Sequence, residues 1–489
     1  MPAGLIQLVR HGSQDLFFTG NPQITFFKTV YRRYTNFAKD TIVQNFQDID
    51  TSLLTDRERK LRTKIERYGD LVHTMYFVFD LPDIKSSNNR RFRWIKNIGT
   101  NLINHVSILI AGQTIDKHYG EWLNIWHELT LPLEKQDTYN KMIGNIPEMY
   151  MPEDAPGNGG VYPESDIDNG VVPSIQSRRI YVPLIFWFNR NPGLALPLIA
   201  LQYNDIEIEF ELKGLRDLYT IMETDASRTD YGYRIKPETS ISAHGIQNYV
   251  ADGTIVTSEN GTRTLQKFDI NPFLLIDYIY LDEKERRRFA LNQHEYLIEQ
   301  TNQSVFLGLE GSHTLDLDLH LPTKEFVWVT KRNDAEDRND WNNYTNWIDE
   351  KIPPFTPGFL NEYEAAETIT TANYSYYKSP HIINESVLLL DGYERFLEQP
   401  GEYFNWIQPY THHKKCPKTG IHIYSFAIDA DKFPQPTGNM NASHFNSIEL
   451  RVITQSVYTT QTYKFDINVY AVEYNILRVI GGMAGKVFS

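Results

Sequence analysis

The chain contains several short stretches in which apolar and polar residues alternate. In residues 206–212, apolar residues alternate with Glu, so the apolar side chains share one face of an extended strand. The same period of two recurs in residues 315–321 and 464–469. Residues 76–79 and 106–110 are more continuously apolar, which is typical of strands buried on both faces. The pattern predicts antiparallel β-sheets in both halves of the chain.

Helical periodicity is limited to short segments. Within residues 119–129, Trp122, Ile125 and Trp126 recur at helical spacing and form an apolar stripe that can cover the end of a sheet. A second, weaker helix is expected in residues 281–289. Because no strand is followed by a glycine-rich phosphate loop and a helix, the doubly wound nucleotide-binding folds are disfavoured. We predict an all-β fold, a sandwich or jelly roll, with short helices in connecting loops.

The length of 489 residues exceeds what one hydrophobic core usually organises, which predicts two sheet domains. Several glycines lie among polar residues after position 212, and we place a linker at residues 214–236. The first domain is then expected at 31–213 and the second at 237–489. Residues 1–30 form a separate N-terminal segment.

Composition and charge exclude several classes of protein. The formal net charge of −14 gives no general attraction for phosphate backbones, so direct nucleic-acid binding is not expected. Cys416 is the only cysteine, which excludes an internal disulfide and fits synthesis in a reducing compartment. The N-terminus has no signal-peptide pattern, and no apolar run approaches the roughly 18 residues of a transmembrane helix, so we expect no transmembrane segment.

Three segments carry a resemblance to a known family. Residues 12–38 read GSQDLFFTGNPQITFFKTVYRRYTNFA, residues 187–203 read WFNRNPGLALPLIALQY, and residues 435–443 read QPTGNMNAS. The first closely resembles the N-terminal signature of major capsid proteins of nucleocytoplasmic large DNA viruses, and the others resemble further motifs of that family. With a last match at residues 474–485, the resemblance spans the whole chain.

The resemblance implies two consecutive eight-stranded antiparallel jelly rolls per chain and a homotrimer with a hexagonal outline. Such a capsomer would contact neighbouring capsomers, penton proteins and minor capsid proteins in an icosahedral virion that is assembled in the host cytoplasm. The implied role is structural, with no enzymatic activity, no cofactor and no metal.

The N-terminal segment is rich in apolar side chains that precede the first strand, and they are too many to leave in water. We predict that it is an assembly segment that docks beneath the capsomer. The residues singled out are Leu16, Phe17, Phe18, Phe26, Phe27, Arg32 and Arg33. The two arginines could meet acidic neighbours or an internal viral membrane, although ordinary solvated charges explain them equally well.

Two long excursions, 132–177 and 333–367, interrupt the strands and are expected to be surface features. In the second, Trp341 and Trp347 are candidates for an exposed loop or a contact between subunits. Six sequons offer possible glycosylation sites, although chance explains them better in a chain without a signal peptide. They lie at Asn260, Asn302, Asn343, Asn373, Asn384 and Asn441.

Two clusters of possible ligands or catalytic groups are disfavoured. The first consists of His412, His413, Cys416 and His422. Its spacing matches no standard zinc pattern. The second, Asp316, Asp318 and His320, shares one strand face, and a solvent-facing strand explains it better than catalysis does.

A cellular jelly-roll protein that binds or cleaves carbohydrate stays open as the alternative function. Tyr and Trp rings stack on sugars, and paired carboxylates hydrolyse the glycosidic bond. Glycan binding by a monomer would favour this alternative.

Overall fold

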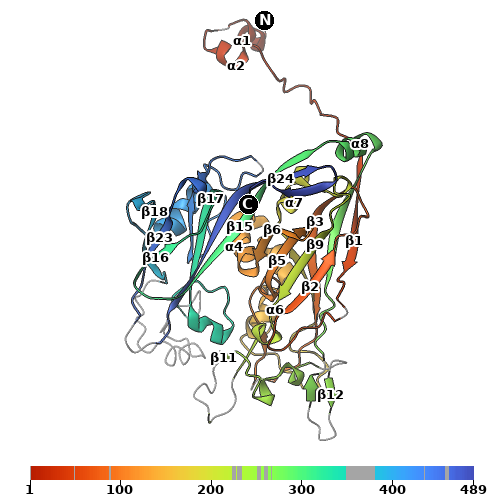
Figure 1. Cartoon of the computed structure of the whole chain (residues 1–489), viewed down its shortest axis with the longest axis vertical. Helices are drawn as coiled ribbons and strands as arrows, with labels where there is room; N and C mark the ends of the chain where they lie inside the picture. Colours follow the sequence, from red (N-terminus) through yellow and green to blue (C-terminus); the bar gives the residue numbers. More distant parts are fainter. Residues whose placement is uncertain are drawn as a thin grey trace.

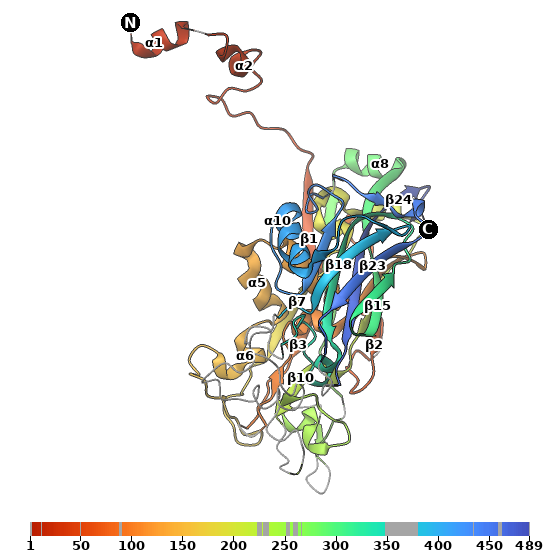
Figure 2. The ribbon, with the colours of Figure 1, turned by 90° about the vertical axis from the view of Figure 1, so that its left-hand side faces the viewer.

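The computed structural model describes residues 2–10, 12–48, 50–87, 90–222, 227, 234–250, 255–257, 263–265, 267–347, 380–433, 435–457 and 462–488. They form two β-barrels side by side, and an N-terminal arm extends away from both (Figure 1). In the view at a right angle, the arm leaves the body at the end where helix α8 lies, whereas α6 and β10 lie towards the opposite end (Figure 2).

The first barrel consists of two facing antiparallel sheets with the orders β1-β14-β3-β7 and β2-β9-β5-β6. The strands are β1 (Phe37–Asn45), β2 (Arg59–Lys64), β3 (Leu71–Leu81), β5 (Ile103–Ile110), β6 (Gln113–Tyr119), β7 (Arg178–Pro183), β9 (Ile206–Leu212) and β14 (Phe273–Leu281), and β8 (Leu196–Pro197) extends β3. The last strand, β14, lies between β1 and β3, which is the order of a jelly roll.

The second barrel repeats this arrangement with the orders β15-β24-β17-β21 and β16-β23-β18-β19. The strands are β15 (His294–Leu309), β16 (Ser312–Asp316), β17 (Pro322–Arg332), β18 (Ile383–Leu390), β19 (Tyr393–Glu394), β21 (Ile421–Ser425), β23 (Ile448–Thr454) and β24 (Phe465–Ile480), with β20 (Gln399–Pro400), β22 (Met440–Asn441) and β25 (Met483–Lys486) at the margins. Again the last long strand, β24, lies between the first and third. The predicted all-β fold of two consecutive jelly rolls is confirmed.

The structure corrects the predicted boundary between the two barrels. β14 pairs with β1 along its whole length and also with β3, so residues 273–281 complete the first barrel. The predicted linker at 214–236 instead carries β10 (Tyr219–Met222) and β11 (Arg234–Ile235), which form a small sheet with β4 (Arg93–Trp94). A turn-rich segment resembles a linker in sequence, but here it is a long connection within one barrel. The chain enters the second barrel after α8 (Glu283–Leu291).

Short helices fill the connections. The predicted helix at 119–129 is α4 (Gly120–Thr130), and the weaker one at 281–289 is α8. The others include α3 (Ile98–Leu102), α5 (Leu133–Ile143), α6 (Pro147–Tyr150), α7 (Trp187–Arg190), the π-helix η8 (Tyr403–Ile407) and α10 (Gln408–His412). None of the helices in the described ranges is long and apolar enough to cross a membrane.

The predicted strands are found with different accuracy. The alternating segment 206–212 coincides with β9, and residues 76–79 and 106–110 lie within β3 and β5. The strand expected at 464–469 is the beginning of the much longer β24. The strand predicted at 315–321 ends at Asp316, and residues 317–321 form the connection to β17, which begins at Pro322.

The sheet that contains β24 is buried on both of its faces. Ile467, Val469 and Ala471 point into the core of the second barrel, whereas Tyr470 and Val472 belong to a core that is continuous with the first barrel. β17 alternates in the same way. Since each buried large apolar side chain contributes roughly 1.5–3 kcal/mol, this shared core holds the two barrels together as one body.

Candidate functional site

The N-terminal arm contains two short helices, α1 (Ala3–Val9) and α2 (Asp15–Thr19), and an extended stretch that leads to β1. Its apolar side chains are left in solvent: Phe17 is 89% and Phe27 97% exposed. Leu16, Phe18 and Phe26 are exposed as well, as are Arg32 and Arg33. Figure 1 shows the arm standing clear of the barrels. In the part of the chain that the structure describes, these apolar side chains of the arm remain uncovered.

Helix α4 of the first barrel packs against the sheet of the second barrel that contains β24, on the face that points away from the core of the second barrel. The ring of Trp122 packs 5.1 Å from that of Tyr470, measured between centroids. Tyr470 donates its hydroxyl to the Glu121 carboxylate at 2.7 Å, and Asn468 donates to the same carboxylate. The predicted apolar stripe therefore covers a sheet, as expected, but the sheet belongs to the neighbouring barrel.

A buried chain of charges runs through this boundary. Arg190 of α7 binds Glu299 of β15, and the Lys324 ammonium lies 2.8 Å from the other oxygen of Glu299. Glu325 lies beside Lys324 and accepts a hydrogen bond from His413 at 2.9 Å.

The chain of charges continues at both of its ends. On its other nitrogen, His413 lies 2.9 Å from Asp431. At the opposite end, the guanidinium of Arg190 lies 4.1 Å from the centre of the Trp126 ring. The six ionisable side chains are each at most 9% exposed.

The charges in this chain are balanced when His413 is protonated. Burial alone would lower the pKa of His413, but the charge of Glu325 and the hydrogen bonds to Asp431 and Glu325 outweigh it and raise the pKa to about 9. Burial by itself would raise the pKa of Glu325, and the neighbouring His413 and Lys324 charges bring it below its usual value instead. Three cations then face three carboxylates.

This arrangement fixes geometry rather than performing chemistry. Buried ion pairs recover little more than their desolvation cost, but breaking one leaves an uncompensated charge in the interior. The charge chain therefore penalises any displacement of Arg190 and α4 relative to the second barrel.

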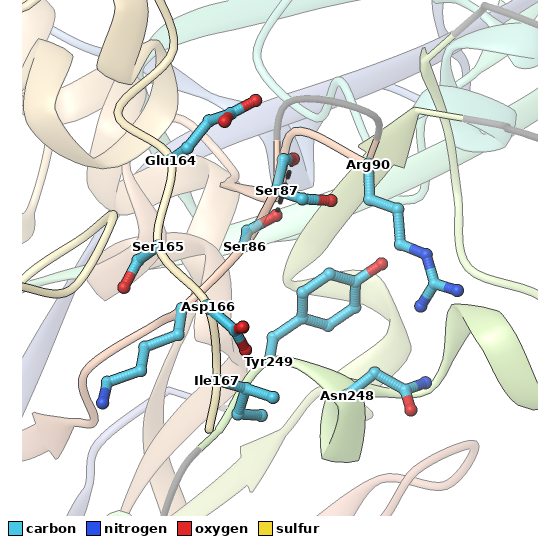
Figure 3. A pocket seen from close by; sticks show the side chains of 10 residues that line it. Ser86, Ser87, Arg90, Glu164, Ser165, Asp166, Ile167, Asn248 and Tyr249 are labelled. Atoms are coloured by element: carbon cyan, nitrogen blue, oxygen red, sulfur yellow. Dashed lines mark hydrogen bonds between the residues drawn. The ribbon is translucent and has the colours of Figure 1, made fainter. Parts of the chain in front are cut away.

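A polar cavity of about 640 Å³ lies beside the segment that follows β3 in the first barrel, and Figure 3 shows the side chains that line it. It is lined by Lys85, Ser86, Ser87, Arg90, Glu164, Ser165, Asp166, Ile167, Asn248 and Tyr249. Lys85 donates to the Gly170 carbonyl and Arg90 to the Ala243 carbonyl, so these two cations tie the loops together. The described lining contains no histidine or cysteine.

Trp341 and Trp347, predicted as candidates for an exposed loop or a contact between subunits, are both partly buried against the rest of the chain. The Trp341 indole donates to the Asp217 carbonyl at 3.0 Å, and the Lys213 ammonium lies 3.7 Å from its ring centre. Trp347 is half-buried. Trp341 thus connects the second barrel to the first within one chain, and the part of this excursion at 348–367 lies outside the described residues.

The sequons fall in different environments. Asn302, Asn384 and Asn441 are exposed, and Asn260 and Asn373 lie outside the described residues. Asn343 is buried, and its side-chain amide donates to the Trp347 carbonyl. Modification of Asn343 would require this loop to open.

The two disfavoured clusters are separated or solvated. His422 is fully buried and stacks on Trp328, whereas His413 belongs to the charge chain and Cys416 is exposed. Asp318 and His320 form an exposed pair at 3.2 Å. Within the part of the chain that the structure describes, no three such side chains gather as a metal site would require.

Sequence reasoning did not identify the charge chain. Its members are spread from residue 190 to residue 431, and their proximity depends on the docking of two barrels. One signal was available: Lys324 and Glu325 stand inside a strand that is otherwise apolar enough to be buried, and buried charges are rarely unpaired.

Comparison with known proteins agrees with this architecture along the whole chain. A family model described as the major capsid protein N-terminus matches residues 25–282, and one described as the large eukaryotic DNA virus major capsid protein matches residues 285–485. The chain is 32% identical to the major capsid protein of Phaeocystis pouchetii virus and 32% identical to that of Paramecium bursaria Chlorella virus 1, with 100% of both chains covered in each case.

Solved structures show the same fold. A chain in the quasi-atomic model of the PBCV-1 virus capsid superposes with a TM-score of 0.67 at 26% identity, over 95% of this chain and 100% of that chain. The Faustovirus major capsid protein gives a TM-score of 0.66 at 11% identity, over 96% and 94% of the two chains, which is a likeness of fold. With two jelly rolls that meet where the two family models meet, the chain belongs to the major capsid proteins of large eukaryotic DNA viruses.

Proposed function

We propose that this capsid protein forms a homotrimer with a hexagonal outline, and that the trimers tile the faces of an icosahedral shell. The observation that carries the proposal is the repetition of one strand order in two barrels that lie side by side. Three such chains around a threefold axis supply six similar barrels, so a threefold assembly can pack in a sixfold lattice.

The N-terminal arm is proposed to fasten the capsomer to the shell. An exposed run of Phe and Leu loses free energy when it leaves water, and the described arm residues of this kind are exposed in the single chain. We place the arm beneath the capsomer, where neighbouring capsomers, penton proteins and minor capsid proteins would cover it. Arg32 and Arg33 would there meet acidic groups of those partners or of an internal membrane surface.

The proposed role needs no catalysis. The buried charge chain and the shared core hold two barrels in a fixed relation, which is what a lattice unit requires. We propose that the protein is made and assembled in the host cytoplasm, in keeping with its single cysteine, and acts in the virion.

Electron microscopy of the purified full chain tests the proposal. We expect particles with a hexagonal outline and six density lobes that average with threefold symmetry. Single two-lobed particles that bind glycans would overturn the proposal and support the carbohydrate-binding alternative, with the polar cavity beside the segment that follows β3 as the place to look for the sugar.

A further inference from the structure

The two barrels correspond strand by strand, and so do their helical connections. β1, β14, β3 and β7 of the first barrel occupy the places of β15, β24, β17 and β21 in the second. In the first barrel, α4 follows β6 and precedes β7; in the second, η8 and α10 follow β19 and β20 and precede β21. A surface contact that one barrel makes therefore has a defined counterpart on the other.

Within one chain, the helix of the first barrel covers the sheet of the second. One row of residues across that sheet is Gln303, Tyr470, Val327 and Ile423, which are register partners on adjacent strands. Trp122 of α4 lies over Tyr470, and Tyr470, Val327 and Ile423 are fully buried. This is an apolar helix face docked on an apolar sheet row.

The counterparts of both surfaces are uncovered. On the second barrel, Trp406, Ile407 and Tyr410 of η8 and α10 are 57%, 55% and 83% exposed. Ile428, 78% exposed, lies beside them because its carbonyl contacts the ring of His412. We name these four residues the aromatic patch; α10, the helix that carries Tyr410, is labelled in Figure 2.

The sheet of the first barrel presents the matching row. Val43 pairs with Leu275, Leu275 with Tyr76, and Tyr76 with Pro183, so four apolar or aromatic side chains cross β1, β14, β3 and β7. Val43 is 54% exposed and the other three are half-buried. We name these four residues the open sheet row.

We propose that the aromatic patch of one copy docks on the open sheet row of the next copy and thereby repeats between chains the contact that α4 makes within the chain. The inference rests on the proposed trimer and names its interface. The contact is heterologous, because patch and row are different surfaces, and such contacts close into a ring when the rotation between copies is a fraction of a full turn. If the barrels pack as around a sixfold axis, as in the proposed trimer, two barrels per chain close the ring after three chains.

Light scattering of wild-type protein and charge variants tests the pairing. Tyr410→Asp places a charge in the aromatic patch and leaves the open sheet row intact. Val43→Asp places a charge in the open sheet row and leaves the aromatic patch intact. Each variant alone is expected to be a monomer with the circular dichroism of the wild type. Tyr393→Asp, at another exposed tyrosine of the second barrel, is the matched control and should leave the trimer intact.

Mixing the two variants provides a second readout that misfolding cannot imitate. Each pair has one intact patch and one intact row, so the mixture should form dimers of twice the 57.0 kDa chain mass and no trimers. Trimers from either variant alone, or a mixture that stays monomeric, would overturn the pairing while the wild-type trimer stands. A monomeric wild type would overturn the proposed trimer itself, and the pairing with it.

Discussion

His413 is enclosed by Glu325 and Asp431, and its protonation is therefore coupled to folding. Its pKa in the folded chain is about 9, above the value near 6.5 of an unfolded histidine. Protonation of His413 therefore contributes roughly 3 kcal/mol to the free energy of unfolding. This contribution is fully present below about pH 6.5 and is lost as the pH rises towards 9.

Thermal melts between pH 6 and pH 10 check this coupling in the wild type and in His413→Gln. The glutamine variant lacks the titration, so the wild type should be more stable by the largest margin at pH 6, and the margin should shrink steadily up to about pH 9. A margin that does not change with pH would show that His413 is neutral in the folded chain.

Glu299 and Glu295 offer a matched pair on the same strand, β15. Glu299 binds Arg190 and Lys324 in the interior, whereas Glu295 binds Arg478 at the surface at 2.8 Å. Glu299→Gln leaves two buried cations with reduced compensation and should lower the free energy of unfolding by about 3–5 kcal/mol. Glu295→Gln should cost less than about 1 kcal/mol. Urea denaturation measures both, and equal losses would contradict the role of the charge chain.

At the scale of the element, the turn between β24 and β25 depends on glycine. Gly482 has a φ of +85°, and a Cβ at this position would lie 2.5 Å from the Tyr203 ring. Gly482→Ala should therefore lower the free energy of unfolding by about 1–3 kcal/mol, which in a chain of this length lowers the midpoint of thermal unfolding by about 1–3 degrees. Gly485, which has open space around it, is the control, and Gly485→Ala should change the midpoint little. Similar midpoints for both variants would argue against the strained turn.

Strands with one buried face could be predicted from the sequence, because alternation records which side faces water. β9 coincides with its predicted range for this reason. β24 was predicted only at its beginning, because Tyr470, Ala471 and Val472 follow one another without a polar residue and the alternation disappears. The position of β14 could not be derived from local pattern, since it depends on pairing with β1, more than two hundred residues earlier in the chain.

The candidate surfaces were predictable to different degrees for the same physical reason. The exposed arm is a local run of apolar residues, and the sequence alone indicates it. The charge chain and the open sheet row are brought together by folding from distant segments, so only the three-dimensional structure reveals them. His413 illustrates the difference, because its neighbours in sequence suggest a metal ligand and its neighbours in space are carboxylates.

At the scale of the whole molecule, the arm and the barrels are expected to have separate roles. Deletion of residues 1–30 should remove no contact of either core, since residues 2–10 and 12–30 are all exposed. The shortened chain should keep its thermal stability and its trimer but should fail to assemble into sheets or shells under conditions where the full chain does. Loss of the trimer on deletion would instead assign the arm to contacts within the capsomer.

Light scattering coupled to size exclusion on the full chain tests the proposed trimer, because sixfold packing requires three chains of two barrels each. A single species with three times the 57.0 kDa chain mass is expected. A stable monomer, or a hexamer, would contradict the proposed capsomer, since neither places six barrels around one axis.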